Sequence, residues 1–397
     1  MRITTMLVGW VTMASLVFIP VQFVFAGETF WTVAIGRWNE GTNWSNGIPG
    51  AFDTAVIDNG GVAQLDSDAA RVDRVEVGRA SDGKVEHTSG TSSVYVLGLA
   101  ISPNSQGEYQ LSGSGRIETS YLNAGLGGTG RFAQTGGAVL ATNNVNAGWD
   151  AGSYGTIDLS GNATMAAPQC AIGTFGDGVF IQHGGTVQFN GYLILGWGPS
   201  GHGTYTLENG ELTMLAGQGY NNVEIGVRGT GYFVQHGGAH TIHGNLVLGS
   251  VAGADGTYEC YAGHLQADRV LVGHEGLGKF LVWGTEPVIS IGVYEQAPTG
   301  RLTSEIQPTG IACITVAETA TLGGTWHVLS NNAEYGRFYV LSCANGLTGS
   351  FDDVVLPGVD WNWGIDGTAL WVEHVPEPAT LALLAMGGMA VMRRKHA

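Results

Sequence analysis

The sequence is poor in charge, and above all in positive charge. Charged residues make up 12% of the 397 residues, and 16 Lys and Arg stand against 33 Asp and Glu, which gives a formal net charge of −17. The only lysines are Lys84, Lys279 and Lys395. A protein that binds DNA or RNA needs a basic surface to neutralise phosphates. The composition therefore excludes a nucleic-acid partner.

Cysteine and proline are also scarce. The four cysteines include no Cys-x-x-Cys pair, which argues against a zinc or thioredoxin-type site. Eleven prolines, without a three-residue glycine period, exclude collagen. We therefore expect no metal and no cofactor. Cys313 and Cys343 are the candidates for a disulfide, because an oxidising compartment permits one.

Glycine is what the chain has in excess. Its 65 glycines are about 16% of the residues, roughly twice the usual share. The hydrophobic fraction of 44% is too high for a disordered chain. The length allows two or three ordinary domains or one elongated repeat array.

A repeat of about 24 residues fills the middle of the chain. Each unit begins with glycine and places an apolar residue two positions later, while the residue between them is mostly polar. The nine initial glycines are Gly83, Gly107, Gly130, Gly155, Gly178, Gly203, Gly231, Gly256 and Gly278. The third residues are Val85, Tyr109, Phe132, Ile157, Phe180, Tyr205, Phe233, Tyr258 and Phe280. This alternation predicts a strand with one face inward.

Two further short strands complete each unit. One follows a glycine, as at 187–189 or 212–214, and one has the form apolar-x-apolar-Gly, as at 193–196 or 246–249. Glycine suits the corners because it accepts φ > 0. Three strands and three corners predict one coil of a single-stranded parallel β-helix, an all-β solenoid. About nine coils over residues 75–295 would give a rod about 43 Å long.

Glutamines alternate with apolar residues at the fifth place of the repeat. They are Gln134, Gln182 and Gln235, and each precedes a glycine corner. An inward amide can satisfy backbone groups that a tight turn leaves unpaired, which is the interpretation that we favour. A polar channel for a ligand is the alternative.

The segments that flank the repeats are predicted to be β-rich caps. Residues 27–74 contain Trp31, Trp38 and Trp44, and residues 296–374 contain strand-like runs such as 339–341 and 347–351. Bare solenoid ends would expose an apolar cross-section, so an aromatic plug is expected. With the repeats, these flanks resemble bacterial surface proteins of the autotransporter-passenger type, although no transporting β-barrel follows.

Residues 1–26 have the form of a secretory signal peptide. Arg2 precedes an apolar run, and Val24-Phe25-Ala26 provides a cleavage site after Ala26. A permanent membrane helix is less favoured, because Pro20 interrupts the run.

The C-terminal segment, residues 375–397, has three parts. Pro376, Glu377 and Pro378 are followed by an apolar stretch over 379–392 and by Arg393, Arg394 and Lys395. This order closely resembles the PEP-CTERM sorting signal of Gram-negative bacteria. The resemblance implies an exosortase-type processing enzyme as a partner, anchoring in the cytoplasmic membrane through a C-terminal helix, and then transfer to the cell surface or extracellular matrix. An ordinary C-terminal anchor is the alternative.

The repeats offer little for catalysis. A polysaccharide lyase typically needs acidic calcium ligands and a nearby Lys or Arg, but Lys84 and Lys279 lie about eight coils apart. Asp150, Asp177 and Asp255 lie near corner glycines, where aspartate is a common turn residue. We predict that the chain is not an enzyme.

Three histidines are candidates for zinc ligands. His236, His240 and His243 lie close in sequence, but extended spacing sends His240 and His243 to opposite faces. We expect His240 to be a core histidine.

Two tryptophans are candidates for contact with a glycan. Trp149 and Trp197 each follow a corner glycine, two coils apart, with Phe175 near the corner between them. An exposed aromatic strip could stack on sugar rings, and packing within the corner is the favoured alternative. The sequence thus predicts a secreted, exosortase-sorted surface or matrix solenoid with a structural or adhesive role. A carbohydrate-binding or polysaccharide-cleaving β-helix, with extracellular polysaccharide as its partner, is the alternative.

Overall fold

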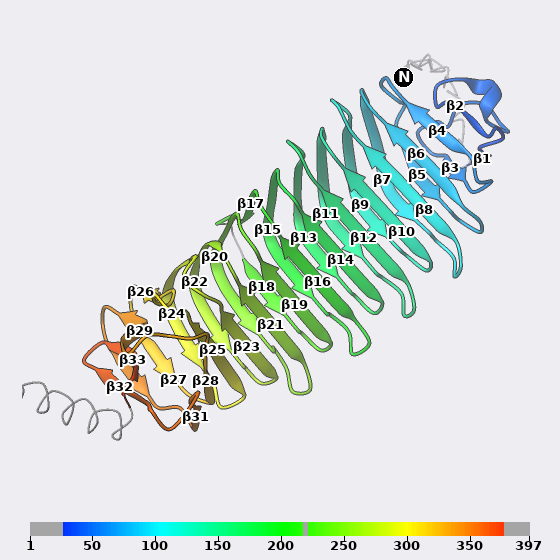
Figure 1. The fold of residues 1–397 in the computed structure, drawn as a ribbon. Helices are drawn as coiled ribbons and strands as arrows, with labels where there is room; N and C mark the ends of the chain where they lie inside the picture. The colour runs from blue at the N-terminus through cyan, green and yellow to red at the C-terminus, as the bar shows by residue number, and fades with distance from the viewer. Residues whose placement is uncertain (1–26, 217–220, 377–397) are drawn as a thin grey trace, which may run out of the picture.

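The chain winds into a straight β-rod with one end of the described chain at each tip (Figure 1). The computed structural model describes residues 27–216 and 221–376. One 3-10 turn, η1 (Gly41–Asn43), is the only helical element among these residues. The strands belong to two sheets, which we name sheet 1 and sheet 2.

Sheet 1 has 14 strands, one for each turn of the rod. They are β2 (Ile35–Arg37), β4 (Val62–Leu65), β6 (Gly83–His87), β8 (Gln106–Leu111), β10 (Thr129–Gln134), β12 (Tyr154–Leu159), β14 (Asp177–Gln182), β16 (His202–Leu207), β19 (Thr230–Gln235), β21 (Asp255–Cys260), β23 (Leu277–Val282), β25 (Gly300–Ile306), β28 (Thr325–Ser330) and β31 (Asp353–Val355).

Sheet 2 has 19 strands. They are β1 (Glu28–Phe30), β3 (Thr54–Ile57), β5 (Val72–Val77), β7 (Thr91–Leu99), β9 (Arg116–Ala124), β11 (Ala138–Ala147), β13 (Thr164–Ile172), β15 (Thr186–Leu195), β17 (Glu211–Met214), β18 (Asn222–Ile225), β20 (Ala239–Leu248), β22 (Gly263–Val272), β24 (Pro287–Gln296), β26 (Ile314–Val316), β27 (Ala320–Leu322), β29 (Gly336–Cys343), β30 (Leu347–Gly349), β32 (Trp361–Asp366) and β33 (Ala369–His374).

Each strand pairs in parallel with its counterpart in the next turn, which confirms the β-solenoid. Gly83 pairs with Gly107, Gly107 with Gly130, and so on to Gly278, so that the nine initial glycines form one column. Parallel strands need a crossover between them, and here the rest of each coil provides it.

The rod has about 14 turns, rather than the nine expected. β4 pairs with β6 and β25 with β23, so the parallel ladder continues into both flanks. Gly61, Gly300 and Gly324 occupy the same column as the nine glycines, and each is followed two residues later by a buried apolar residue. At about 4.8 Å per turn, the rod is about 65 Å long.

Most turns in the middle of the rod consist of two strands, where three were expected. β15 covers both the 187–189 and 193–195 segments, and its pairing with β13 shifts register between Ala167 and Gln169. A β-bulge bends the strand there, so that one strand forms two sides of the coil. In the following turn the same two segments are the separate strands β17 and β18.

The third residue of every repeat faces inward, as predicted. All nine side chains are at most 2% exposed. Phe180, Tyr205, Phe233 and Tyr258 stack face to face along the axis with ring centroids 4.6, 5.0 and 4.7 Å apart. This continuous apolar column is the centre of the core.

The glutamine column satisfies corner backbone groups, which confirms the structural interpretation. The Gln235 Nε2 donates to the His264 carbonyl at 3.0 Å, and its Oε1 accepts from the Tyr258 hydroxyl at 2.7 Å. Gln182 makes the equivalent bonds to the Glu211 carbonyl and the Tyr205 hydroxyl. Each amide therefore joins two successive turns.

The two ends of the rod differ. Trp31, Trp38 and Trp44 are buried beside the first turns, with edge-to-face ring contacts at 5.0 and 4.8 Å. At the other end β33 pairs antiparallel with both β29 and β32. Because the parallel ladders cross the 74/75 and 295/296 boundaries, the flanks extend the solenoid, and their role as separate caps is not confirmed.

Candidate functional site

The C-terminal end of the fold is held by a histidine. His374, the last residue of β33, stacks on Trp361 with ring centroids 4.4 Å apart and an interplanar angle of 3°. Its Nε2 lies 2.9 Å from Asp360 Oδ2, and its Nδ1 lies 3.0 Å from the Ala333 carbonyl oxygen. The Val375 amide then donates to the Asp360 carbonyl at 2.8 Å. The solenoid is thus fastened up to Val375.

Pro376, the first residue of the Pro-Glu-Pro segment, follows this clamp after one residue. A residue before proline is restricted to extended backbone, so the chain leaves the rod in an extended form at the point where the Pro-Glu-Pro segment starts. The other predicted sorting residues, Glu377, Pro378, Arg393, Arg394 and Lys395, and the apolar stretch between them lie outside the described residues. Within the part of the chain that the structure describes, no helix is long and apolar enough to cross a membrane.

The fold and its C-terminal exit define a β-solenoid with a sorting tail attached directly to its last strand. Residues 374–395 match the family model described as the PEP-CTERM protein-sorting motif. Such a motif implies export, processing by an exosortase and association with the cell surface. No curated protein and no solved structure matches the chain.

The predicted signal-peptide cleavage site adjoins an acidic contact. Gly27, which would become the N-terminus after cleavage at Ala26, donates its backbone N–H to Asp53 Oδ1 at 3.1 Å. The other oxygen of this carboxylate accepts from the Gly50 amide at 2.8 Å. Cleavage would convert the Gly27 nitrogen into an ammonium group, and its hydrogen bond to Asp53 would become charge-assisted.

This contact predicts that signal removal strengthens the docking of β1. We expect Asp53→Asn to lower the free energy of unfolding by about 1 kcal/mol more in the cleaved chain than in one that retains residues 1–26. Urea denaturation of the natural sequence and of Asp53→Asn, each with and without residues 1–26, measures the difference between the two losses. N-terminal sequencing establishes the cleavage site. Equal losses in both backgrounds would show that the Gly27 ammonium does not bind Asp53.

The candidate glycan contacts lie on the corner between sheet 2 and sheet 1. Trp149 and Trp197 are 37% and 43% exposed, and Phe175 is 41% exposed on the turn between them. The Phe175 amide donates to the Trp149 carbonyl, and the Phe175 ring lies directly over Gly198. Phe175 therefore packs against the next corner, whereas a sugar contact by the two tryptophans stays a prediction.

Cys313 and Cys343 do not form a disulfide in this structure, where all four cysteines are free. Because Ile314 pairs with Leu341, Cys343 lies opposite Val316, three residues along the strand from Cys313. Three residues of strand span about 10 Å, which exceeds the reach of a disulfide. A local sequence pattern does not specify the register of these strands.

His240 lies in the core, as predicted. It is completely buried, stacks on Phe233 at 4.7 Å, and lies 3.0 Å through Nδ1 from the Tyr258 hydroxyl. The Tyr258 hydroxyl already donates its proton to Gln235 Oε1. The Nδ1 of His240 is therefore protonated and donates to the Tyr258 hydroxyl oxygen. His243 is exposed on the opposite face.

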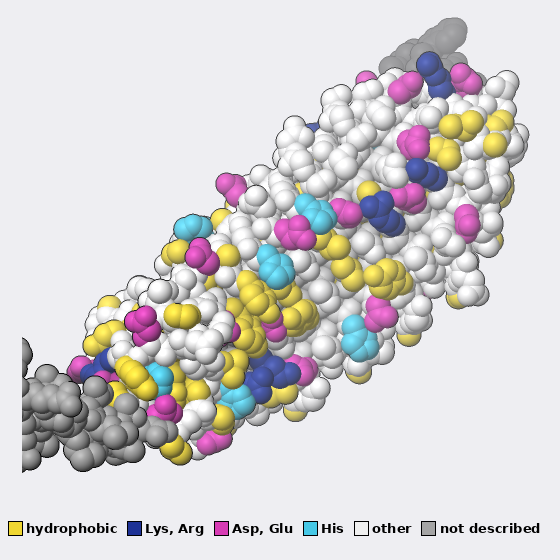
Figure 2. Space-filling view, in the orientation of Figure 1, with side chains coloured by type: hydrophobic (Ala, Val, Ile, Leu, Met, Phe, Trp, Pro, Cys, Tyr) yellow, Lys and Arg dark blue, Asp and Glu magenta, His cyan; other side chains and the backbone are white. Residues whose placement is uncertain are grey.

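The lysines of the repeats already have acidic partners. Lys84 Nζ lies 3.1 Å from Glu86 Oε1, and Lys279 Nζ lies 2.7 Å from Asp255 Oδ2. On the face that Figure 2 shows, acidic and basic side chains are scattered along the rod, not gathered into a field of one sign. Both lysines therefore form ion pairs with carboxylates of the same chain.

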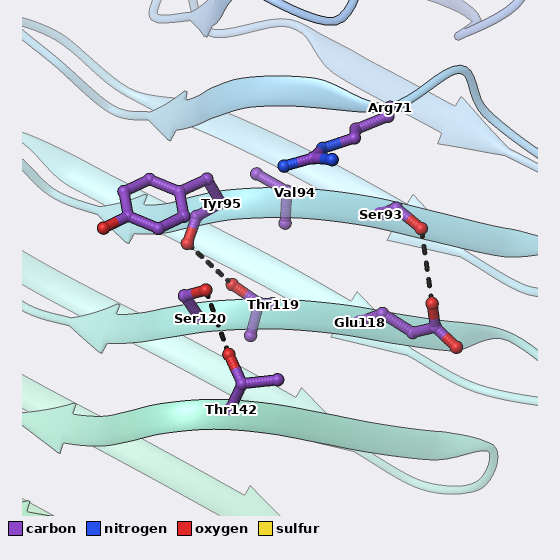
Figure 3. A pocket seen from close by; sticks show the side chains of 8 residues that line it. All are labelled: Arg71, Ser93, Val94, Tyr95, Glu118, Thr119, Ser120 and Thr142. Carbon is purple, nitrogen blue, oxygen red and sulfur yellow. Dashed lines mark hydrogen bonds between the residues drawn. The ribbon is translucent and has the colours of Figure 1, made fainter.

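Sheet 2 carries a shallow groove of about 250 Å³ (Figure 3). Its lining consists of Arg71, Ser93, Val94, Tyr95, Glu118, Thr119, Ser120 and Thr142. Hydrogen bonds join Ser93 to Glu118, Thr119 to the Tyr95 carbonyl, and Ser120 to Thr142. The groove follows the bend in the strands, and many of its polar groups already bond to one another.

A second aromatic corner, which was not predicted from the sequence, lies at the end of three successive sheet 1 strands. His236, Tyr261 and Trp283 follow β19, β21 and β23 directly, and we name these three residues the aromatic corner. They lie on three successive turns and line up along the rod. The signal was present, because each residue occupies the sixth place of its repeat, next to the column that contains the glutamines.

Proposed function

We propose that this chain is an exosortase-processed rod of the cell surface or extracellular matrix, with a structural or adhesive role and no catalysis of its own. The observation that supports this proposal is the junction at the C-terminus. The clamp at His374, the first residue that the sorting motif matches, ends the solenoid one residue before Pro376, so the folded rod and the Pro-Glu-Pro segment adjoin. Processing there would leave the folded rod whole.

The shape of the rod also favours a structural role. A solenoid of about 14 turns presents long columns of outward residues, and each turn contacts only its neighbours. A net charge of −17 keeps such a surface soluble and repels anionic polymers. The proposed partners are therefore an exosortase-type enzyme and a polysaccharide without strong negative charge.

The sorting motif provides the test. Replacing Pro376, Glu377 and Pro378 by alanine should block tail processing and leave the full-length chain in the membrane fraction, because the recognised segment is lost. Asp366→Ala, at an exposed position in the preceding hairpin, is the control and should be processed normally. Immunoblotting of membrane and released fractions separates the forms. Unchanged processing of the triple variant would contradict the proposal.

Carbohydrate binding or cleavage is the second candidate function. It is favoured by the two exposed tryptophans, Trp149 and Trp197, two turns apart on one corner. Retained polysaccharide would support binding, and the release of reducing ends would establish an enzyme. Neither outcome would alter the sorting assay.

A further inference from the structure

The aromatic corner forms a short stack on the outside of the rod. The rings of His236 and Tyr261 have centroids 5.0 Å apart, and those of Tyr261 and Trp283 have centroids 5.6 Å apart with an interplanar angle of 8°. Tyr261 is 38% exposed, so the stack is open to solvent. The stack exposes aromatic surface on three consecutive turns.

The stack ends at Trp283, where the regular corner is interrupted. The equivalent residue of the next turn is Glu305, which carries no ring, and the chain then makes a wider loop closed by a bridge between Gln307 and Gly310. A cavity of about 410 Å³ lies at this place. Its lining consists of Tyr261, Trp283, Gly284, Thr285, Glu286, Glu305, Gln307, Pro308 and Thr309. This cavity is wide open to solvent, like the groove on sheet 2, so a ligand there would be covered on one face.

Two of the donors at this cavity already bond to carboxylates. The Tyr261 hydroxyl donates to Glu259 Oε2 at 2.7 Å, and the Gln307 amide donates to Glu305 Oε2 at 2.6 Å. Burial and the neighbouring Glu259 carboxylate raise the pKa of Tyr261 to about 12, so the phenol keeps its proton. The indole Nε1 of Trp283 is buried without a hydrogen-bond partner among the described residues.

These features fit one class of ligand. A pyranose ring has an apolar C–H face that can lie against an aromatic ring, and hydroxyl groups around its edge that can donate to carboxylates. The lining contains two carboxylates, Glu286 and Glu305, and no Lys or Arg. An anionic sugar such as a uronate would therefore be repelled.

We propose that this cavity is a glycan subsite that binds a pyranose without negative charge, with the ring against Trp283 and with its hydroxyl or amino groups donating to Glu305. The proposal deepens the proposed surface role by naming the polymer class. It does not depend on the sorting motif, because binding is measured on the purified chain and processing is measured in cells.

Calorimetric titration of the full chain tests the site with defined hexasaccharides. Cellohexaose, mannohexaose and a glucosamine hexamer are the uncharged and cationic probes, and galacturonic acid hexamer is the anionic one. We expect binding to at least one of the first three and none to the last. Trp283→Ala and Glu305→Gln should each weaken binding at least tenfold, whereas Trp283→Phe keeps an aromatic face and should retain most of it.

Matched variants locate the site. Trp149→Ala and Trp197→Ala remove exposed tryptophans from the other corner and should leave binding unchanged. Thermal melts verify that each variant is folded. If Trp283→Ala does not fold, Glu305→Gln still tests the site. The absence of binding to all three non-anionic probes would overturn the proposal, as would full binding in both Trp283→Ala and Glu305→Gln. Equal displacement by tetramethylammonium would instead identify a simple cation site.

Discussion

Replacing Gly203 by alanine is expected to destabilise the centre of the rod severely. Gly203 is the first glycine of its repeat and lies in β16. An alanine Cβ there would lie 2.1 Å from the Ile172 carbonyl oxygen, 2.7 Å from the Gly196 amide nitrogen and 2.9 Å from the Leu195 Cα. All three atoms are backbone, so no side chain can rotate away.

The reason for glycine at this place differs from the one that the sequence suggested. The corner glycine Gly173 has a φ of +68°, as expected for a turn that requires the left-handed region. Gly203 is not among the residues with positive φ. Its role is to let one turn's backbone approach the corner of the preceding turn, which explains why the whole column is glycine.

We expect Gly203→Ala to lower the free energy of unfolding by about 3 kcal/mol or more, because overpacking against backbone cannot relax locally. Repeat arrays can unfold in parts. Hydrogen exchange should therefore show lost protection in β13–β16 before the rest of the rod, and thermal melting should show a lower midpoint.

Gly184→Ala is the matched control. Gly184 lies in a corner of the same region, but an added Cβ would meet its nearest neighbour, the Gly161 carbonyl oxygen, at 3.4 Å. This is an ordinary contact, so the variant should melt within a few degrees of the natural chain. Similar melting of Gly203→Ala and Gly184→Ala would show that the close approach of turns is not what requires glycine.

Acid is expected to weaken the rod through His240. Burial lowers the pKa of His240 to about 3, compared with an ordinary value of 6.5, so the folded state keeps it neutral. The unfolded chain binds a proton at this residue below about pH 6.5. The contribution of His240 is therefore complete above pH 6.5 and is lost progressively as the pH falls toward 3.

The expected loss from this residue is about 2 kcal/mol between pH 7 and pH 5, since each pH unit below the unfolded pKa contributes up to about 1.4 kcal/mol. His240→Leu removes the titrating group, and leucine already occupies the equivalent places at Leu212 and Leu265. Its stability should fall less over the same range. Urea denaturation at several pH values measures both slopes.

The exposed His243 provides the control for this experiment. His243→Asn changes a histidine on the same strand, β20, outside the core, and shows what the loss of a histidine does without a change in the core. Burial also lowers the pKa of His87, which adds to the slope that His240→Leu retains. Parallel loss of stability in His240→Leu and the natural chain would rule out His240 as the acid-sensitive group.

The local sequence pattern was sufficient to predict the strands that form the sides of the rod. Glycine followed by alternating polar and apolar residues predicts the sheet 1 strands and their inward face, because side chains in a strand alternate between faces. The same pattern continues at Gly61, Gly300 and Gly324. The predicted nine turns are too few because these three glycines lie in the segments that are predicted to be flanking caps.

The sequence by itself determined the sorting motif, the repeat and the inward columns, since each depends on residues close together in the chain. Only the tertiary structure decided how distant corners meet. The offset of Cys313 from Cys343, the backbone contact that requires Gly203, and the alignment of Tyr261 with Trp283 all depend on the register between turns. Register is set by hydrogen bonds between residues more than 20 positions apart, and a local sequence pattern does not specify it.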